Sequence, residues 1–394
     1  MREGRRADVR DAVLITAAVW VLALALWLDV RFMGGILGRI STDTMTIHGD
    51  FDTFWRSARA FWEGRDVYAT GAELENLNPP LWVLLISLLG LLEPLVAYRF
   101  LVMITLIVTV GYLAWVAGEL RLRPAWAVVG GVMLLLSSPL LATLALGQIY
   151  PFLALGLVAA WVSDRRGRHT VSGAALGLVV ALKPSLVPLL LWPLVRRRWR
   201  TVGTAVAAGV VATFIGAVVV GFGATLDWLE LLSGSSASAY WDNASLPATA
   251  ARLFTDNPYA RHVTVLPWTV PVAYALGIAA VAVTAWRVRG GAEVGLWALV
   301  AASLLVSPIA WHNYLVLLGP GILLLLARGW VAPAFLLLSL QAIPGQWVLL
   351  WNEQGTVAAT LALTLYFYIL ILHWLALLFA AKEPAGVPES AKGG

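Results

Sequence analysis

The sequence predicts an all-α, polytopic membrane protein, and three observations carry this prediction. Of the 394 residues, 60% are hydrophobic and 12% are charged, and the mean hydropathy is +0.82; a water-soluble fold could not bury so much apolar surface. The apolar residues form runs of about 15 to 25, the length of membrane-spanning helices, whereas barrel strands would show about 10 alternating residues. The 27 basic and 22 acidic residues lie mostly between these runs. We therefore expect a bundle of about 11 to 13 transmembrane helices.

The N-terminal region predicts a retained first span followed by a long polar loop. Residues 1–10 contain four arginines, and the apolar run at 11–28 lacks the cleavage pattern of a signal peptide. We expect a cytoplasmic N-terminus and a first extracytoplasmic loop at 29–78. Further apolar segments lie near 81–97, 99–118, 125–142, 149–163, 171–195, 201–222, 266–286, 293–309, 313–327, 329–345 and 356–380. A second large external loop is expected at 223–265, within one transmembrane domain, 1–382, that precedes a disordered cytoplasmic tail, 383–394.

Arginine-rich runs at 165–168, 196–200 and 287–289 predict the topology, because cytoplasmic loops carry such an excess. The same basic runs favour contact with anionic lipid and not with nucleic acid. This assignment makes 171–195 a broken helical hairpin and leaves open the side on which Arg121 and Arg123 lie. It places several polar stretches on the outer side: Asp50, Gly147-Gln148, Lys183-Pro184, 223–265, 307–313 and 343–355.

The stretch that begins at Asp50 is the first candidate for chemistry. Aromatic residues recur near helical spacing from Phe51 to Trp62, with charged residues between them, which predicts an amphipathic helix at a membrane interface. Asp50 and Asp52 stand at its start. Carboxylates are favoured at a helix N-terminus, so Asp50 could be only an N-cap; the alternative is a catalytic carboxylate.

Other polar residues within or beside apolar runs also have two interpretations. Lys183 could be a snorkelling lysine, but Pro184 favours a helix break and a polar cavity in which a cation could hold a phosphate. Gln148 could merely end a helix, and His312 could be a structural interfacial histidine. The loop 233–257 holds hydroxyl, amide and aromatic groups that could bind sugars, as many polar loops do. The chain has no cysteine, which excludes disulfides and thiolate metal sites.

The ordered motifs resemble those of one family. They are similar to the motifs of the polyprenyl-phosphate-mannose-dependent mannosyltransferases, glycosyltransferase family 87 of the GT-C superfamily. In chain order the motifs are Asp50-Phe51 followed by Gly64 and Tyr68, Asn78-Pro79-Pro80, Gly147-Gln148, Ala181 to Pro184, Asn243 to Leu246 with Arg252, and Ser307-Pro308 to Trp311-His312. The chain departs from that pattern at Asn313, where a second histidine is expected, and at Tyr150, where relatives tend to have asparagine.

The resemblance implies an enzyme in the plasma membrane that moves a sugar, with inversion, from a polyprenyl phosphate to a lipid or glycan hydroxyl on the extracytoplasmic side. Asp50 would be the general base, with Asp52 as the fallback. No cofactor is implied, and a divalent metal is not favoured. The donor phosphate would meet Lys183, His312 and Arg252. Sugar or acceptor would meet Tyr68, Asn78, Gln148, Asn243, Ser245, Trp311 and Asn313. The alternatives are a secondary transporter or lipid flippase, and a protein that only binds a lipid-linked glycan.

Overall fold

The computed structural model describes residues 2–33, 38, 40–41, 45, 48–234, 237–291, 293–343 and 355–381, and these residues form helices and loops without a strand. The predicted tail 383–394 and most of the loop 343–355 lie outside them. The helices are α1 (Arg2–Met33), α3 (Gly49–Trp62), α4 (Pro80–Ile86), η2 (Ser87–Leu91), α5 (Pro94–Glu119), α6 (Pro124–Leu135), α7 (Ser138–Leu146), α8 (Tyr150–Arg165), α9 (His169–Leu182), η3 (Pro184–Leu190), α10 (Leu191–Val195), α11 (Trp199–Val220), α12 (Phe222–Gly234), α13 (Leu246–Phe254), α14 (Thr269–Val288), α15 (Gly295–Val306), η4 (His312–Leu318), α16 (Gly319–Ala327), α17 (Val331–Ala342), α19 (Val357–Leu363) and α20 (Leu365–Ala380).

Most helices coincide with the predicted apolar segments, which confirms the polytopic helical class, while α3, α12 and α13 lie in the two predicted external loops. Among the described residues, four helices are long and apolar enough to cross a membrane: 11–31 within α1, α5, α11 and α14. The pairs α6/α7 and α19/α20 each add a bent segment, with bends of 45° and 44°. The remaining apolar segments are helices of 10–17 residues, so several predicted spans are shorter or more broken than a straight crossing requires.

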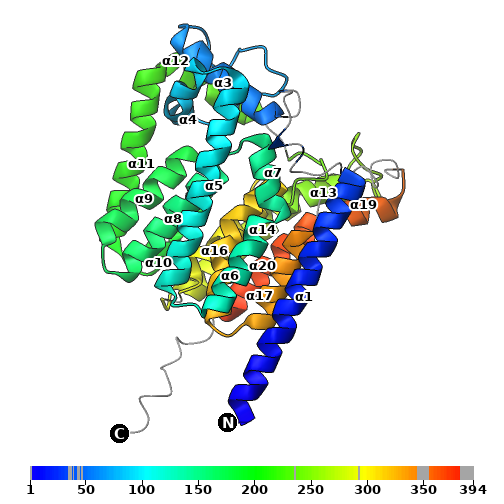
Figure 1. Cartoon of the computed structure of the whole chain (residues 1–394). Helices are drawn as coiled ribbons and strands as arrows, with labels where there is room; N and C mark the ends of the chain where they lie inside the picture. The colour runs from blue at the N-terminus through cyan, green and yellow to red at the C-terminus, as the bar shows by residue number, and fades with distance from the viewer. Residues whose placement is uncertain are drawn as a thin grey trace.

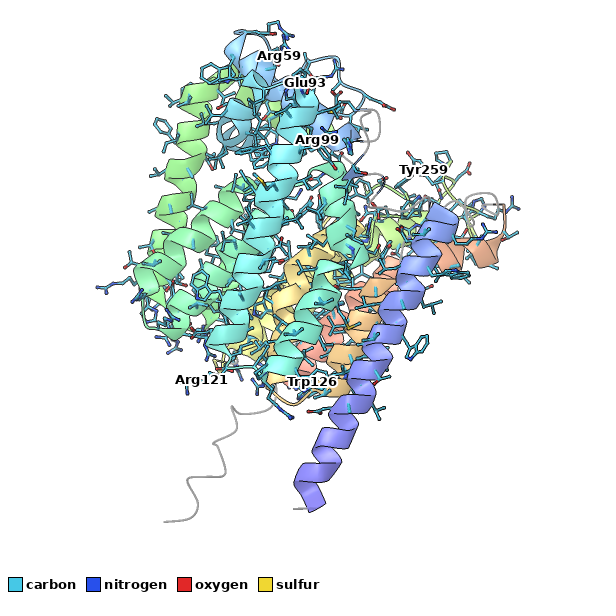
Figure 2. The ribbon with its side chains drawn as sticks, viewed as in Figure 1. Arg59, Glu93, Arg99, Arg121, Trp126 and Tyr259 are labelled. Carbon is cyan, nitrogen blue, oxygen red and sulfur yellow. The ribbon has the colours of Figure 1, made fainter. Side chains whose placement is uncertain are left out.

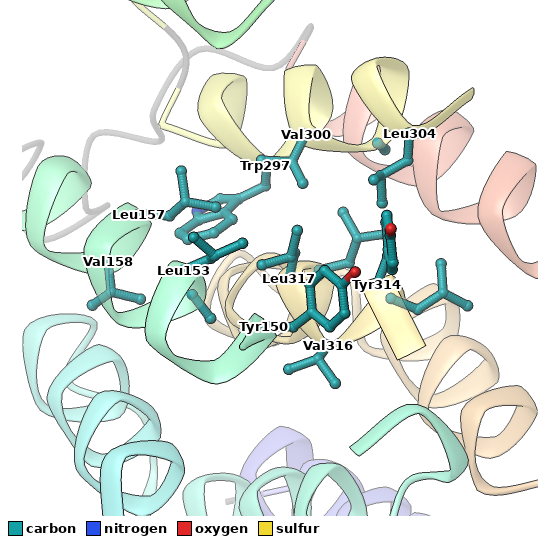
Figure 3. Close-up of a cluster of buried hydrophobic side chains, with 14 of the residues drawn as sticks. Tyr150, Leu153, Leu157, Val158, Trp297, Val300, Leu304, Tyr314, Val316 and Leu317 are labelled. Carbon is teal, nitrogen blue, oxygen red and sulfur yellow. The ribbon is translucent and has the colours of Figure 1, made fainter. Parts of the chain in front are cut away.

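One helix, α15, is surrounded by the rest of the bundle. Its residues from Gly295 to Leu305 are all buried, as expected for a helix that is apolar on every side. Figure 3 shows Trp297, Val300 and Leu304 of this helix facing side chains of α8 and η4. This core fixes the relative positions of the first turns of α8 and η4.

Ion pairs gather the arginine-rich runs at one end of the bundle, which we call the basic end. Arg196 donates to Asp164 at 2.7 Å, so the end of α10 lies beside the end of α8. Arg166 donates to Glu119 at 2.6 Å, and Arg165 pairs with both Glu119 and Glu293. Charged groups from α5, α8, α10 and the loop before α15 therefore meet at the same end.

The basic end bears on the predicted hairpin at 171–195 and on the position of Arg121, which the sequence left open. Since 171–195 leaves from and returns to this end, with its break at Lys183, it is a broken hairpin, as predicted. Arg121 and Trp126 lie at this end, opposite Arg59 and Glu93 (Figure 2). Residues 81–118 therefore pass between the two ends once, through α5, while α4 and η2 stay near α3 (Figure 1). The N-terminus of α1 points to the basic end as well.

The amphipathic helix is present as α3, which lies at the end opposite the basic end (Figure 1). It buries Phe51, Phe54 and Ala58 and exposes its arginines. The interpretation of Asp50 as its N-cap is wrong. The helix begins at Gly49, and His48 occupies the cap position without a side-chain hydrogen bond, so the Asp50 carboxylate serves another purpose.

Candidate active site

Asp50 lies in the first turn of α3 and points to the segment between α7 and α8. Its Oδ2 accepts a hydrogen bond of 2.6 Å from Nε2 of Gln148. The approach is close because residue 147 is glycine: its φ is +67°, and a Cβ there would lie 2.7 Å from Cβ of Phe51. The left-handed backbone at Gly147 ends α7 and directs Gln148 toward the carboxylate.

A buried histidine anchors the start of α3. His48 Nδ1 lies 2.6 Å from the carbonyl oxygen of Ala145, and its ring stacks on Tyr98 with centroids 3.8 Å apart. The Tyr98 hydroxyl donates to the carbonyl of Leu144 at 2.9 Å. Carbonyls in the last turn of a helix lack partners within it, so both side chains bind the end of α7 where α3 docks. His48 was not predicted to be important, because nothing in the sequence of the polar loop around it indicates a packing role.

Several groups act on the ionisation of Asp50. Burial raises its pKa from 3.8 to about 6, the hydrogen bond from Gln148 lowers it, the charge of Asp242 raises it, and the charge of Lys183 lowers it. These electrostatic effects place the carboxylates of Asp50 and Asp242 and the ammonium of Lys183 in one site. A carboxylate whose pKa is near neutrality is a stronger base than an exposed one and is still mostly ionised at pH 7.

Lys183 lies at the break of the hairpin, as the sequence predicted. It follows the last residue of α9 with φ −141° and ψ 84°, because the proline ring at 184 disfavours helical backbone at the preceding residue. Its Nζ donates to the hydroxyl of Tyr314 at 2.8 Å. Of the two interpretations, this position agrees with the polar cavity and not with snorkelling, since the ammonium is hydrogen-bonded inside the bundle.

His312 reaches the same site from the segment before η4. Its Nδ1 is hydrogen-bonded to Oδ1 of Asp242, and its ring stacks on Tyr366 with centroids 4.5 Å apart. These two contacts hold the ring in place. Asp242 was not selected from the sequence, because it stands among many polar residues of the loop 233–257 and its partner is 70 residues away.

Two residues predicted to bind sugar instead hold these loops together. Asn243 donates to the carbonyl of Pro308 at 2.9 Å and accepts from the backbone N–H of Ala310 at 2.9 Å. Ser245 accepts from the N–H of Ala248 at 3.2 Å and caps α13. Asn243 therefore joins the loop of Asp242 to the segment before His312, and Ser245 fixes the start of α13.

Arg252 also has a different position from the one expected for a phosphate ligand. Its side chain is fully buried and donates to the carbonyls of Ala239, Tyr240 and Asn243 and to the hydroxyl of Thr364, at 2.7–3.2 Å. Burial lowers its pKa to about 10, so it stays charged at neutral pH. The guanidinium thus stabilises the backbone that carries Asp242, which differs from the expected role of a phosphate ligand.

The first loop places two predicted sugar ligands away from Asp50. The Tyr68 hydroxyl donates to the carbonyl of Asn78 at 2.9 Å, next to Asn76, which donates to Ser57 of α3 at 2.9 Å. Ser57 lies two helical turns from Asp50, about 10 Å along the axis. Tyr68 faces a separate hollow of about 420 Å³, so these residues shape the outer loop and do not line the site of Asp50.

The remaining predicted residues have distinct surroundings. Asp52 is hydrogen-bonded to Arg56 at 2.7 Å on the more exposed face of α3, so the fallback base points elsewhere. Trp311 forms a bridge with Asn243 and remains close to His312. Asn313 is buried, and its side-chain amide has no hydrogen-bond partner within the described part of the chain. The described residues also contain no group of three or more His, Asp or Glu side chains that could hold a metal ion.

Comparison with known proteins identifies the family. Glycosyltransferase family 87 matches residues 76–308, a range that includes the motifs from Asn78 to Pro308 and excludes Asp50 and His312. The polyprenol-phosphate-mannose-dependent alpha-(1-2)-phosphatidylinositol mannoside mannosyltransferase of Mycobacterium tuberculosis is 29% identical over 317 residues, which cover 71% of this chain and 70% of that protein. The protein of the same description from Mycolicibacterium smegmatis is 25% identical over 363 residues, covering 80% and 78%.

Two further similarities are more distant. An alpha-(1->3)-arabinofuranosyltransferase of Mycobacterium tuberculosis is 29% identical over 209 residues, 51% of this chain and 46% of that protein. The crystal structure of ArnT from Cupriavidus metallidurans bound to undecaprenyl phosphate aligns with 94% of this chain and 77% of that one, at 16% identity and a TM-score of 0.38. Because the family match covers more than half of the sequence, the chain belongs to glycosyltransferase family 87.

Proposed function

We propose that this membrane glycosyltransferase moves mannose from a polyprenyl-phosphate carrier to a hydroxyl of a lipid or glycan acceptor, with inversion. The names of the two mannosyltransferase relatives support the donor, while the arabinofuranosyltransferase relative shows that sugars differ among similar proteins. The observation that carries the mechanism is the convergence of Asp50, Lys183 and the Asp242–His312 pair from four distant parts of the chain.

In the proposed reaction, Asp50 takes the proton of the acceptor hydroxyl as its oxygen forms a bond to the anomeric carbon. The bond between that carbon and the phosphate oxygen breaks, and its electron pair leaves with polyprenyl phosphate. The leaving group is already an anion, so it needs a cation more than an acid. Lys183 and the His312 ring would meet this phosphate, and one displacement inverts the anomeric centre.

The test compares Asp50→Asn with Asp52→Asn in the transfer of radiolabelled mannose from synthetic polyprenyl-phosphate mannose to a membrane lipid extract. Both variants remove one carboxylate of α3, but only Asp50 contacts Gln148. We expect Asp50→Asn to be slower by about 10²- to 10⁴-fold and Asp52→Asn to stay near wild-type activity. A folded, fully active Asp50→Asn would refute the base. Transfer by the wild-type protein from arabinose carriers alone would refute the sugar.

We also propose that the site faces the extracytoplasmic side, since the arginine-rich runs lie at the opposite end. Because the chain has no cysteine, single cysteines can be introduced for labelling. Glu73 and Arg168 are both exposed, the first near α3 and the second at the basic end. In intact cells, a membrane-impermeant thiol reagent should label Glu73→Cys and spare Arg168→Cys; the reverse pattern would invert the topology.

The transporter and flippase alternative is not retained. Asp50 lies at the start of α3, at the end of the bundle opposite the basic end, whereas transporters place ionisable residues near the bilayer midplane, between related repeats. The family match also joins the chain to glycosyltransferases.

A further inference from the structure

The ammonium group of Lys183 is held by a pair of tyrosines that the proposed chemistry has not yet used. Its Nζ donates to the Tyr314 hydroxyl at 2.8 Å and lies 4.6 Å from the centre of the Tyr314 ring and 5.8 Å from that of Tyr150. The centroids of the two rings are 4.2 Å apart, and the rings lie side by side at the edge of the apolar cluster in Figure 3. Both tyrosines are buried, with 2% and 3% of their surface exposed, so they form a fixed support.

The two rings belong to α8 and η4, which pack against the buried helix α15. Tyr150 is the first residue of α8, and Tyr314 lies in the first turn of η4. The lysine itself stands outside regular helix, at the break before Pro184. Its long side chain would sample many rotamers if it were free, and holding such a chain in its bound conformation reduces the entropy lost on binding.

We propose that Tyr314 is a positioning residue, which acts with the Tyr150 ring packed behind it to aim the Lys183 ammonium at the phosphate of the polyprenyl carrier. This inference rests on the proposed function and names the phosphate as the group that the assembly serves. One of the three N–H groups of the ammonium is used by Tyr314, which leaves two for phosphate oxygens. The same assembly would hold the phosphate of the donor and that of the released carrier.

The experiment measures steady-state kinetics of four proteins: wild type, Tyr314→Phe, Lys183→Gln and the double variant. Tyr314→Phe keeps the ring and removes the hydroxyl. Because hydrogen bonds to charged groups are worth about tenfold or more in binding, we expect the KM for the donor to rise by about that factor. The inhibition constant of added polyprenyl phosphate should rise in parallel, and the KM for the acceptor should stay unchanged.

The double variant separates positioning from a direct role. If Tyr314 acts through Lys183, its loss should have no further effect once Lys183→Gln is present, whereas independent contributions would multiply. Tyr112→Phe is the matched control, since it removes a hydroxyl from a buried tyrosine of α5 that contacts neither residue. It should leave both KM values unchanged.

Each outcome decides the inference. An unchanged donor KM in Tyr314→Phe, or a multiplicative loss in the double variant, would overturn it while wild-type transfer still supported the proposed function. Absence of wild-type transfer from every polyprenyl-phosphate sugar would instead overturn the proposed function. Should Tyr314→Phe fail to fold, Tyr150→Leu removes the supporting ring and leaves the hydrogen bond; we expect its donor KM to rise about threefold, and no change would contradict the proposal.

Discussion

The pH dependence of transfer tests the environment of Asp50. A carboxylate accepts a proton only when it is ionised, so kcat/KM should fall as the pH drops below the pKa of the base. Burial raises the pKa of Asp50 to about 6, against 3.8 for an exposed aspartate. We therefore expect the acid limb of the wild-type profile to have its midpoint near pH 6, with full activity above it.

Replacement of Gln148 by methionine should move this limb in a known direction. The amide hydrogen bond stabilises the ionised carboxylate and lowers its pKa; methionine keeps the length of the side chain and removes the donor. A hydrogen bond to a charged group contributes about 1.5–3 kcal/mol, and one pKa unit corresponds to about 1.36 kcal/mol. The limb of Gln148→Met should thus lie about one to two pH units higher.

The assay is the initial rate of mannose transfer at subsaturating donor from pH 4 to 9, in one mixed buffer of constant ionic strength. Asp52→Asn serves as the control, because Asp52 pairs with Arg56 and does not touch Gln148; its profile should match the wild type. A wild-type limb near pH 4, or a limb that does not move in Gln148→Met, would show that Asp50 is not the titrating base.

Three further substitutions test the surroundings of the site. Asp242→Asn should move the acid limb to lower pH, the opposite direction, since the Asp242 charge raises the pKa of Asp50; an upward shift would contradict this arrangement. Gly147→Ala should lower both activity and apparent Tm, because φ is +67°, which costs about 1–2 kcal/mol for other residues, and the new Cβ would meet Phe51. Arg252→Met should lower the Tm, because each buried carbonyl left without a partner costs about 1–3 kcal/mol; a stable variant with only a raised donor KM would restore Arg252 as a phosphate ligand.

The sequence predicts much of the fold because the physics that decides it is local. Apolar runs of helical length and the arginine excess between them are visible in any short window, and so is the break at Lys183-Pro184. The end of the bundle at which Arg121 and Arg123 lie could not be predicted from such short windows. It depends on α4 and η2 remaining beside α3, which is a matter of packing between segments and not of hydropathy.

Some residues of the site could likewise be predicted from the sequence, and others could not. Asp50, Gln148, Lys183 and His312 could be selected because each interrupts apolar or aromatic sequence, where a polar group needs a reason. Asp242 could not be distinguished from the other polar residues of its loop, since only its contact with the distant His312 marks it. Arg252 was predicted to bind phosphate because an arginine is a cation. Its partners are three backbone carbonyls and the Thr364 hydroxyl, and contacts with distant backbone leave no pattern in the sequence.

The side chains of the site come from α3, near the beginning of the chain, and from η4, in its last third. Domains emerge from the ribosome with their N-terminal part first. A growing chain can therefore dock α3 onto α7 early and still lack the Asp242–His312 pair and the Tyr314 hydroxyl. Competence for transfer would arise only late in synthesis, so unfinished or truncated chains in the membrane would occupy lipid without consuming the sugar carrier.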